Sequence, residues 1–221
     1  MHRSAPTPIA PSNPTKLNWR PLHAGLFLIL FLLALHVPAI GRWPWYILVP
    51  TAVYAVLCGI LPPLRRTFVW LAVGRSDRSA LAATASIALL STLGLVLYQH
   101  LMKPDVDALA ARLPGTLLGS AILAGACFSF VNAALEEVLF RGVLYDALES
   151  QWGWQTAVII SSTFFGVLHT AGYPPGSLGA VMAGIYGVLL GGLRRETGGL
   201  LWPIVAHVVA DATIFAILFH A

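Results

Sequence analysis

The chain has 221 residues, of which 57% are hydrophobic and only 10% are charged, and its formal net charge is +4. Soluble domains carry about 25% charged residues, so this composition excludes most soluble folds, disordered chains and nucleic-acid binders. The 2 cysteines exclude a disulfide scaffold. We therefore predict an all-α, polytopic integral membrane protein, a bundle of about seven transmembrane helices with short interfacial helices.

The first 21 residues are polar and rich in proline, which predicts a flexible tail. Arg3, Lys16 and Arg20 precede the first apolar run, so a cleaved signal peptide is one interpretation. The tail is long for the charged part of a signal peptide, and the run is long for its apolar part. A retained first helix is therefore favoured.

Apolar runs that could span a membrane follow the tail. They cover residues 22–40, 43–61, 80–102, 116–149, 156–170, 178–193 and 200–219. The first three runs and the loop after them make up a predicted N-terminal region, 22–115, and the others a predicted core region, 116–219. The apolar piece 67–73 is too short to span and is expected at the interface, and the loop 103–114 is expected to hold a short surface helix.

The basic residues predict an orientation. With the N-terminus in the cytoplasm, every Lys and Arg except Arg42, Lys103 and Arg112 falls on the cytoplasmic side of the seven predicted spans. The positive-inside rule therefore predicts a cytoplasmic N-terminus.

Several glycines and histidines have purely structural interpretations. Gly184, Gly187 and Gly191 are expected to allow close packing of helices in lipid. His23 is expected to lie at the membrane interface.

Five ionisable residues lie inside apolar runs, where lipid would exclude them. They are Glu136, Glu137, His169, His207 and Asp211. Such a group costs about 2.5–3.5 kcal/mol in the hydrocarbon region, so it usually faces a cavity or a partner and marks function. At a rise of about 1.5 Å per residue, all of them except Glu137 are predicted to reach a common layer of the bundle.

The spacing of these residues divides them into pairs. Three pairs lie four residues apart and share a helix face, namely Glu137 with Arg141, Phe165 with His169, and His207 with Asp211. Glu136 is offset from its neighbour by about 100° and can point elsewhere. Phe165 can pack beside the His169 ring and fix its rotamer.

These residue types predict hydrolytic chemistry. A carboxylate in a dry cavity is a competent general base toward water near neutral pH, and a neighbouring imidazole can share or shuttle the proton. A second imidazole can donate to a developing oxyanion. Alternatively, Glu136, His169, His207 and Asp211 could ligate a divalent metal such as zinc. No His-Glu-x-x-His motif supports a metal, and no Gly-x-Ser-x-Gly motif indicates a serine nucleophile.

Three segments occur in order on successive predicted helices. They are Glu136-Glu137-Val-Leu-Phe-Arg141, Phe165-Gly-Val-Leu-His169 and His207-Val-Val-Ala-Asp211. Together they resemble the motifs Glu-Glu-x-x-x-Arg, Phe-x-x-x-His and His-x-x-x-Asn/Asp of the CPBP family of intramembrane proteases. That family includes the CAAX prenyl endopeptidases and bacterial Abi proteins. The resemblance covers about residues 116–219, which become the predicted catalytic core.

The resemblance implies a helical fold with a cavity open to the membrane and the cytosol, and hydrolysis of a peptide bond in a membrane-anchored protein or peptide. The implied roles are water activation by Glu136 with His169, oxyanion stabilisation by His207 with Asp211, and support by Glu137, Arg141 and Phe165. A metal-free glutamate mechanism without a cofactor is favoured over a metal-dependent one. The partners implied are the substrate and the lipid bilayer, in a bacterial inner or plasma membrane.

Asp211 departs from the His-x-x-x-Asn of the CAAX enzymes. An ionised aspartate cannot donate a hydrogen bond to an oxyanion. Asp211 is therefore protonated, or orients His207, or ligates a metal.

Two other function classes use the same residues. One is a proton-coupled transporter with these groups as a relay, which the lack of an internal repeat disfavours. The other is a catalytically inactive membrane scaffold, which the presence of all four polar positions disfavours.

Overall fold

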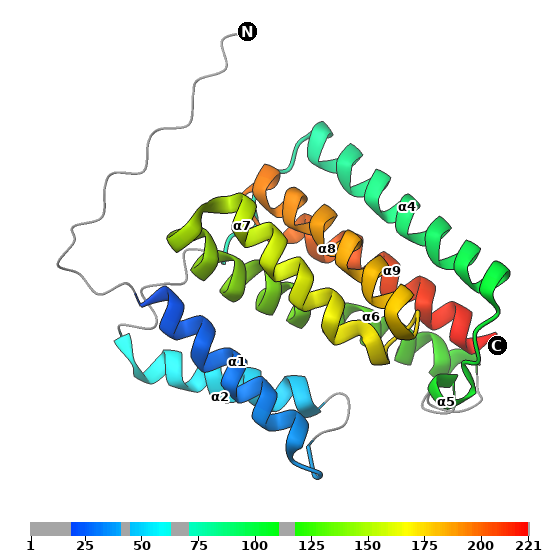
Figure 1. Ribbon diagram of the computed structural model, residues 1–221, viewed down its shortest axis with the longest axis horizontal. Coiled ribbons are helices and arrows are strands. Elements are labelled where there is room, and N and C mark those ends of the chain that lie inside the picture. Colours follow the sequence, from blue (N-terminus) through cyan, green and yellow to red (C-terminus); the bar gives the residue numbers. More distant parts are fainter. Residues whose placement is uncertain (1–18, 41–44, 63–70, 111–117, 221) are drawn as a thin grey trace, which may run out of the picture.

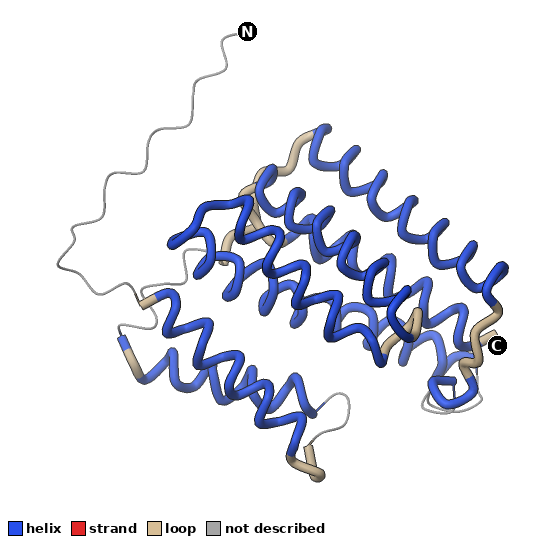
Figure 2. The backbone as a smooth tube through the Cα atoms, viewed as in Figure 1, coloured by secondary structure: helices blue, strands red, loops and turns tan. Residues whose placement is uncertain are grey.

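The computed structural model describes residues 19–40, 45–62, 71–110 and 118–220. These residues form helices and connecting loops with no strand among them (Figure 2), which confirms the prediction of an all-α chain. The predictions for the tail before residue 19, and for residues 67–70 of the expected interfacial piece, lie outside the described residues.

The helical elements follow one another with short connections. In chain order they are α1 (Arg20–His36), α2 (Trp45–Ile60), α4 (Arg78–Met102), α5 (Asp107–Ala110), α6 (Leu118–Glu137), the π-helix η2 (Val138–Leu144), α7 (Tyr145–Leu168), the 3-10 turn η3 (His169–Ala171), α8 (Gly176–Thr197) and α9 (Leu201–Phe219). The short helix α5 falls in the loop where one is predicted.

The centre of the bundle consists of α6, α7, α8 and α9. Helix α7 packs along α8, and α6 packs along α9. Helix α4 covers α9 and α8 on one side, and the hairpin of α1 and α2 contacts α7 and η2 on the other (Figure 1). The helices that carry the predicted motifs are therefore neighbours in space.

The first helix is shorter than its predicted run. Helix α1 ends at His36, before the end of the predicted run 22–40, and Val37 is extended with φ −91° and ψ 112°. Pro38 explains this end, because a proline disfavours helical backbone at the residue before it. The His23 side chain, near the start of α1, is buried, and its Nδ1 lies 2.5 Å from the Tyr54 hydroxyl.

Four described helical segments are long and apolar enough to cross a membrane. They are Arg78–Met102, Ala121–Ala171, Gly176–Thr197 and Leu201–Phe219. Helices α1 and α2 have 17 and 16 residues. That corresponds to about 25 Å at about 1.5 Å per residue, less than the hydrocarbon thickness of about 30 Å. The predicted count of about seven spans is therefore not confirmed.

The segment Ala121–Ala171 has a sharp break at Gly153. The backbone there has φ 81° and ψ 169°, a positive φ that glycine adopts without steric cost. The break lies between the predicted runs 116–149 and 156–170. The long segment is thus two consecutive helices with a turn between them.

Helix α4 carries an apolar face that no other described element covers. Leu89, Leu93 and Leu97 are each more than half exposed along its length. A continuous apolar surface of this kind is unfavourable in water and favourable against lipid tails. This face therefore supports a position of α4 in the membrane.

Close helix packing in the core depends on small residues of α8. A Cβ atom at Gly187 would lie 3.0 Å from the Ser162 side chain of α7, and one at Gly191 would lie 3.2 Å from Val158. Larger residues at these positions would push α7 and α8 apart. The predicted packing role of these two glycines is confirmed.

A backbone clasp joins the segment before α4 to the turn between α8 and α9. The Leu200 N–H donates to the Ala72 carbonyl at 2.9 Å. Gly74, with φ 90°, lies so near Gly199 that an added Cβ would be 2.7 Å from the Gly199 nitrogen. The clasp fixes where α9 begins.

Candidate active site

The two adjacent glutamates lie at the end of α6, directly before the π-helix η2. π-Turns inside α-helices are frequent at functional sites. The Arg194 Nε of α8 donates to the carbonyl of Arg141 in this turn at 3.2 Å. Helix α8 therefore stabilises the irregular backbone that follows the glutamates.

Glu137 and Arg141 form a fully buried ion pair. Arg141 Nη1 donates to Glu137 Oε1 at 2.8 Å, and both side chains are 0% exposed. Arg141 Nη2 also donates to the Gly187 carbonyl at 3.2 Å, and the guanidinium lies 4.5 Å from the centroid of the Phe165 ring. Because a buried charge is costly without partners, these contacts keep both side chains in one place.

His207 is held by the same carboxylate. Its Nδ1 lies 2.8 Å from Glu137 Oε1, and since a carboxylate oxygen only accepts, Nδ1 is the donor. The other nitrogen, Nε2, faces Glu136 Oε2 at 3.7 Å and Asp211 Oδ1 at 3.6 Å. With Nδ1 protonated, Nε2 can donate a hydrogen bond only when the ring is an imidazolium.

His169 is held in the same tautomeric sense as His207, with Nδ1 bonded away from Glu136 and Nε2 facing it. Its Nδ1 lies 2.7 Å from the Phe165 carbonyl, which only accepts, so Nδ1 again carries a proton. In the neutral ring Nε2 is then an acceptor, and it faces Glu136 Oε2 at 3.7 Å. The Phe165 and His169 ring centroids are 4.1 Å apart, so the predicted packing of these two rings is present.

Glu136 lies between the two imidazoles. Its Oε2 has no hydrogen-bond partner among the described residues. It is 3.7 Å from Nε2 of both His169 and His207. That separation is too long for a direct hydrogen bond and short enough for one water to contact both Oε2 and either imidazole nitrogen.

Exposure falls across the cluster in one direction. The His169 and Glu136 side chains are 26% and 13% exposed, whereas those of His207 and Asp211 are 3% and 7% exposed. A reactant would therefore approach from the side of Glu136 and His169. His207 and Asp211 line the deeper side.

Asn132 is a site residue that the sequence analysis missed. It lies on α6 one turn before Glu136, and it is buried. Its Nδ2 donates to Glu136 Oε1 at 3.2 Å and to Asp211 Oδ2 at 3.1 Å. Asp211 thus faces an amide group of α6. An uncharged asparagine in an apolar run gave no strong signal, although its i, i+4 spacing to Glu136 could have pointed to it.

The alternative metal set is Glu136, His169, His207 and Asp211. Within the described residues, no group of three or more His, Cys, Asp or Glu side chains is arranged to hold a metal ion. Neighbouring Nε2 and carboxylate oxygen atoms of this set lie 3.6–3.7 Å apart, and Asn132 bonds to the other oxygen of each carboxylate. The metal-free mechanism favoured from the sequence therefore stays a prediction.

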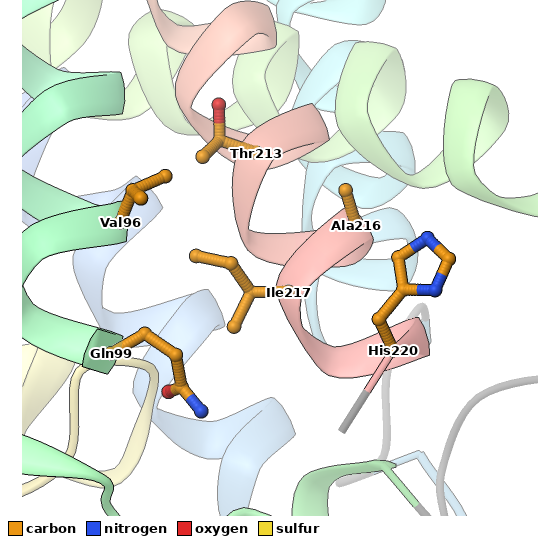
Figure 3. Close-up of a pocket in the computed structure, with 6 residues that line it drawn as sticks. All are labelled: Val96, Gln99, Thr213, Ala216, Ile217 and His220. Atoms are coloured by element: carbon orange, nitrogen blue, oxygen red, sulfur yellow. The ribbon is translucent and has the colours of Figure 1, made fainter.

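Two apolar hollows lie along α9. One of about 370 Å³, between α4 and α9, is lined by Val96, Gln99, Thr213, Ala216, Ile217 and His220 (Figure 3). The other, of about 500 Å³ between α6 and α9, is lined by residues that include Gly125, Ser129, Phe130, Val208, Ala212 and Phe215. Val208 and Ala212 of this second hollow directly follow His207 and Asp211 in the chain.

Comparison with known proteins agrees with this geometry. Residues 118–213 match the family model for "Type II CAAX prenyl endopeptidase Rce1-like" proteins. No curated protein and no solved structure matches the chain. The matched range contains all three motifs and Asn132. The match supports the resemblance read from the motifs: residues 118–213 of this chain are similar to the type II CAAX prenyl endopeptidases.

Proposed function

We propose that the chain hydrolyses a peptide bond of a membrane-tethered protein or peptide with water activated by Glu136 and His169. The observation that carries this proposal is the position of Glu136 Oε2, without a direct partner and 3.7 Å from Nε2 of His169. General acid–base catalysis needs a base within reach of water and an acceptor for the second proton. Glu136 Oε2 is the base, and His169 Nε2 is the acceptor for the second proton.

The first step is attack on the peptide carbonyl. A water held by Glu136 Oε2 and His169 Nε2 loses a proton to the carboxylate as its oxygen bonds to the carbonyl carbon. The carbonyl π electrons move to oxygen, which becomes an oxyanion. His207, as the imidazolium, donates from Nε2 to that oxyanion. The oxyanion electrons then re-form the carbonyl as the C–N bond breaks, and the proton held by Glu136 passes to the leaving nitrogen. The new carboxyl group gives its remaining proton to His169 Nε2, which frees a carboxylate end and an amine end.

Asp211 contributes to this step through its position beside His207. Its Oδ1 lies 3.6 Å from His207 Nε2, and its Oδ2 accepts from Asn132. Both oxygens therefore face donors, so of the three roles open to Asp211 we propose that it orients His207. Its negative charge also favours the imidazolium that the oxyanion needs.

The surroundings suit a substrate that arrives through the membrane. The hollow between α6 and α9 is predominantly apolar, and two of its lining residues, Val208 and Ala212, are the chain neighbours of His207 and Asp211. We propose that it receives an apolar part of the substrate. From the distribution of Lys and Arg we also propose a cytoplasmic N-terminus.

The decisive experiment compares membrane proteomes of cells that express the wild-type chain or Glu136→Ala. We expect membrane proteins that lose a C-terminal segment only when Glu136 is intact. With the cleaved peptide reconstituted in liposomes, Glu136→Ala and His169→Ala should each lower kcat by about 10²- to 10⁴-fold. Glu149→Ala is the matched control, because Glu149 lies near Arg195 at 3.7 Å, outside the cluster. Full activity in either His169→Ala or Glu136→Ala would refute the mechanism.

A metal-free reaction makes a separate prediction. Activity should survive exhaustive chelation, with no stoichiometric metal found by elemental analysis of the active protein. Loss of activity on chelation that added zinc restores would overturn this part of the proposal.

A further inference from the structure

Asn132 makes two hydrogen bonds with a single atom. Its Nδ2 donates one proton to Glu136 Oε1 at 3.2 Å and the other to Asp211 Oδ2 at 3.1 Å. Both acceptors are carboxylates, which cannot donate, so the amide must face them with its nitrogen rather than its oxygen. The side chain is buried, which leaves no water to take its place.

This contact determines which oxygen of Glu136 faces the imidazoles. With Oε1 bonded to Asn132, only Oε2 remains to face Nε2 of His169 and His207. The same amide lies between two carboxylates that would otherwise face each other across α6 and α9. A hydroxyl at this position has one proton and could bond to only one of them, and a carboxylate would repel both.

We propose that Asn132 is a positioning residue for the reaction: its carboxamide aims Glu136 Oε2 at the water site by holding Oε1. This inference rests on the proposed function. A misplaced general base costs rate because the reacting atoms must be aligned before the proton moves. Substrate binding, by contrast, depends on the apolar hollow, in which Asn132 is not a lining residue.

The primary test is Asn132→Ala, assayed in liposomes on the cleaved peptide. We expect kcat to fall by about 10- to 100-fold, the effect of losing a hydrogen bond to a charged group, with KM within about twofold of wild type. Thr84→Val is the matched control. Thr84 is buried on α4, outside both hollows, and its hydroxyl bonds to the Ala80 carbonyl rather than to a carboxylate. Wild-type kcat in a folded Asn132→Ala would overturn the inference.

A double variant that exchanges the two side chains, called the transposed pair, tests whether Asn132 positions Glu136 or only links α6 to α9. The variant Asn132→Asp/Asp211→Asn keeps one amide and one carboxylate facing each other across the two helices, but it removes the donor to Glu136. Its reference is Asp211→Asn alone, so that the two proteins differ only at residue 132. We expect kcat of the transposed pair to be at least about tenfold below this reference, although its unfolding temperature recovers relative to Asn132→Asp.

The outcomes distinguish this inference from the proposed function. A transposed pair with the kcat of its reference would make Asn132 only a tie between helices and would overturn the inference. Equal cleavage by wild type and Glu136→Ala would refute the proposed function and with it the reaction that Asn132 serves. Cleavage that requires Glu136 but not Asn132 would refute this inference alone.

Discussion

Removal of the buried guanidinium should destabilise the protein far more than removal of any surface charge. Arg141 is 0% exposed, donates to Glu137 at 2.8 Å and to the Gly187 carbonyl at 3.2 Å, and lies over the Phe165 ring. Arg141→Met leaves the Glu137 carboxylate buried with a single donor. Breaking one partner of a buried pair costs about 3–5 kcal/mol. At about 2–4 °C per kcal/mol for a chain of this size, the unfolding temperature should fall by about 6–20 °C.

The double variant Arg141→Met/Glu137→Gln tests the cause. Without the charge on either side chain no buried ion remains unpaired, and the glutamine carbonyl still accepts from His207. The double variant should therefore be more stable than either single variant. The measurement is thermal unfolding in one detergent, with Arg195→Met as the surface control, because Arg195 is 53% exposed and should shift the midpoint by less than about 2 °C. A double variant as unstable as the sum of the two single ones would refute the reasoning.

Three further variants test other contacts. Gly187→Ala places a Cβ 3.0 Å from α7 and should lower both kcat and the unfolding temperature. The control Gly94→Ala on α4, where an added Cβ has nothing within 4 Å, should change neither. Equal effects of the two variants would contradict the packing argument. Arg194→Met removes the donor to the π-turn carbonyl and should lower kcat several-fold in a cleavage assay, and unchanged kcat would show that the π-turn needs no support. Hydrogen bonds from the Ala80 N–H and a neighbouring serine hold the pKa of Asp77 below its ordinary value of 3.8, so Asp77 stabilises the fold above that pH and the contribution is lost as pH falls below it. Asp77→Ala should lower the unfolding temperature by about 2–4 °C at neutral pH, and a gap that persists at the lowest pH would contradict this sign.

Charges in apolar runs were readable from the sequence because lipid makes them expensive. Glu136, His169 and His207 stand out for this reason alone. The i, i+4 pair of Glu137 with Arg141 follows from helix geometry, since such side chains share a face. The structure brings these residues together across three helices, as their depths along the predicted spans suggest.

Other features depended on contacts between distant parts of the chain. Asn132 bonds to Asp211, 79 positions away in the chain, and an uncharged amide carries no comparable penalty that would reveal it. The buried position of His23 depends in the same way on Tyr54 of the next helix. The π-turn has no local sequence marker, and it is held by Arg194 from α8. Periodicity reports which face of a helix is apolar, but not which neighbour meets that face.

In the π-helix η2 (Val138–Leu144), a change of one residue alters the direction in which side chains point far more than it alters the length of the membrane segment. A π-turn is equivalent to one residue inserted into an α-helix, and each residue of an α-helix turns the chain by about 100° and lengthens it by about 1.5 Å. Deletion of one residue from η2 would leave the hydropathy and length of the segment almost unchanged. It would nevertheless rotate both glutamates by about a quarter-turn relative to helix α7, which follows η2. A single-codon deletion could thus abolish the chemistry of such a protein while preserving its insertion into the bilayer, a short evolutionary path from an active chain to an inert relative.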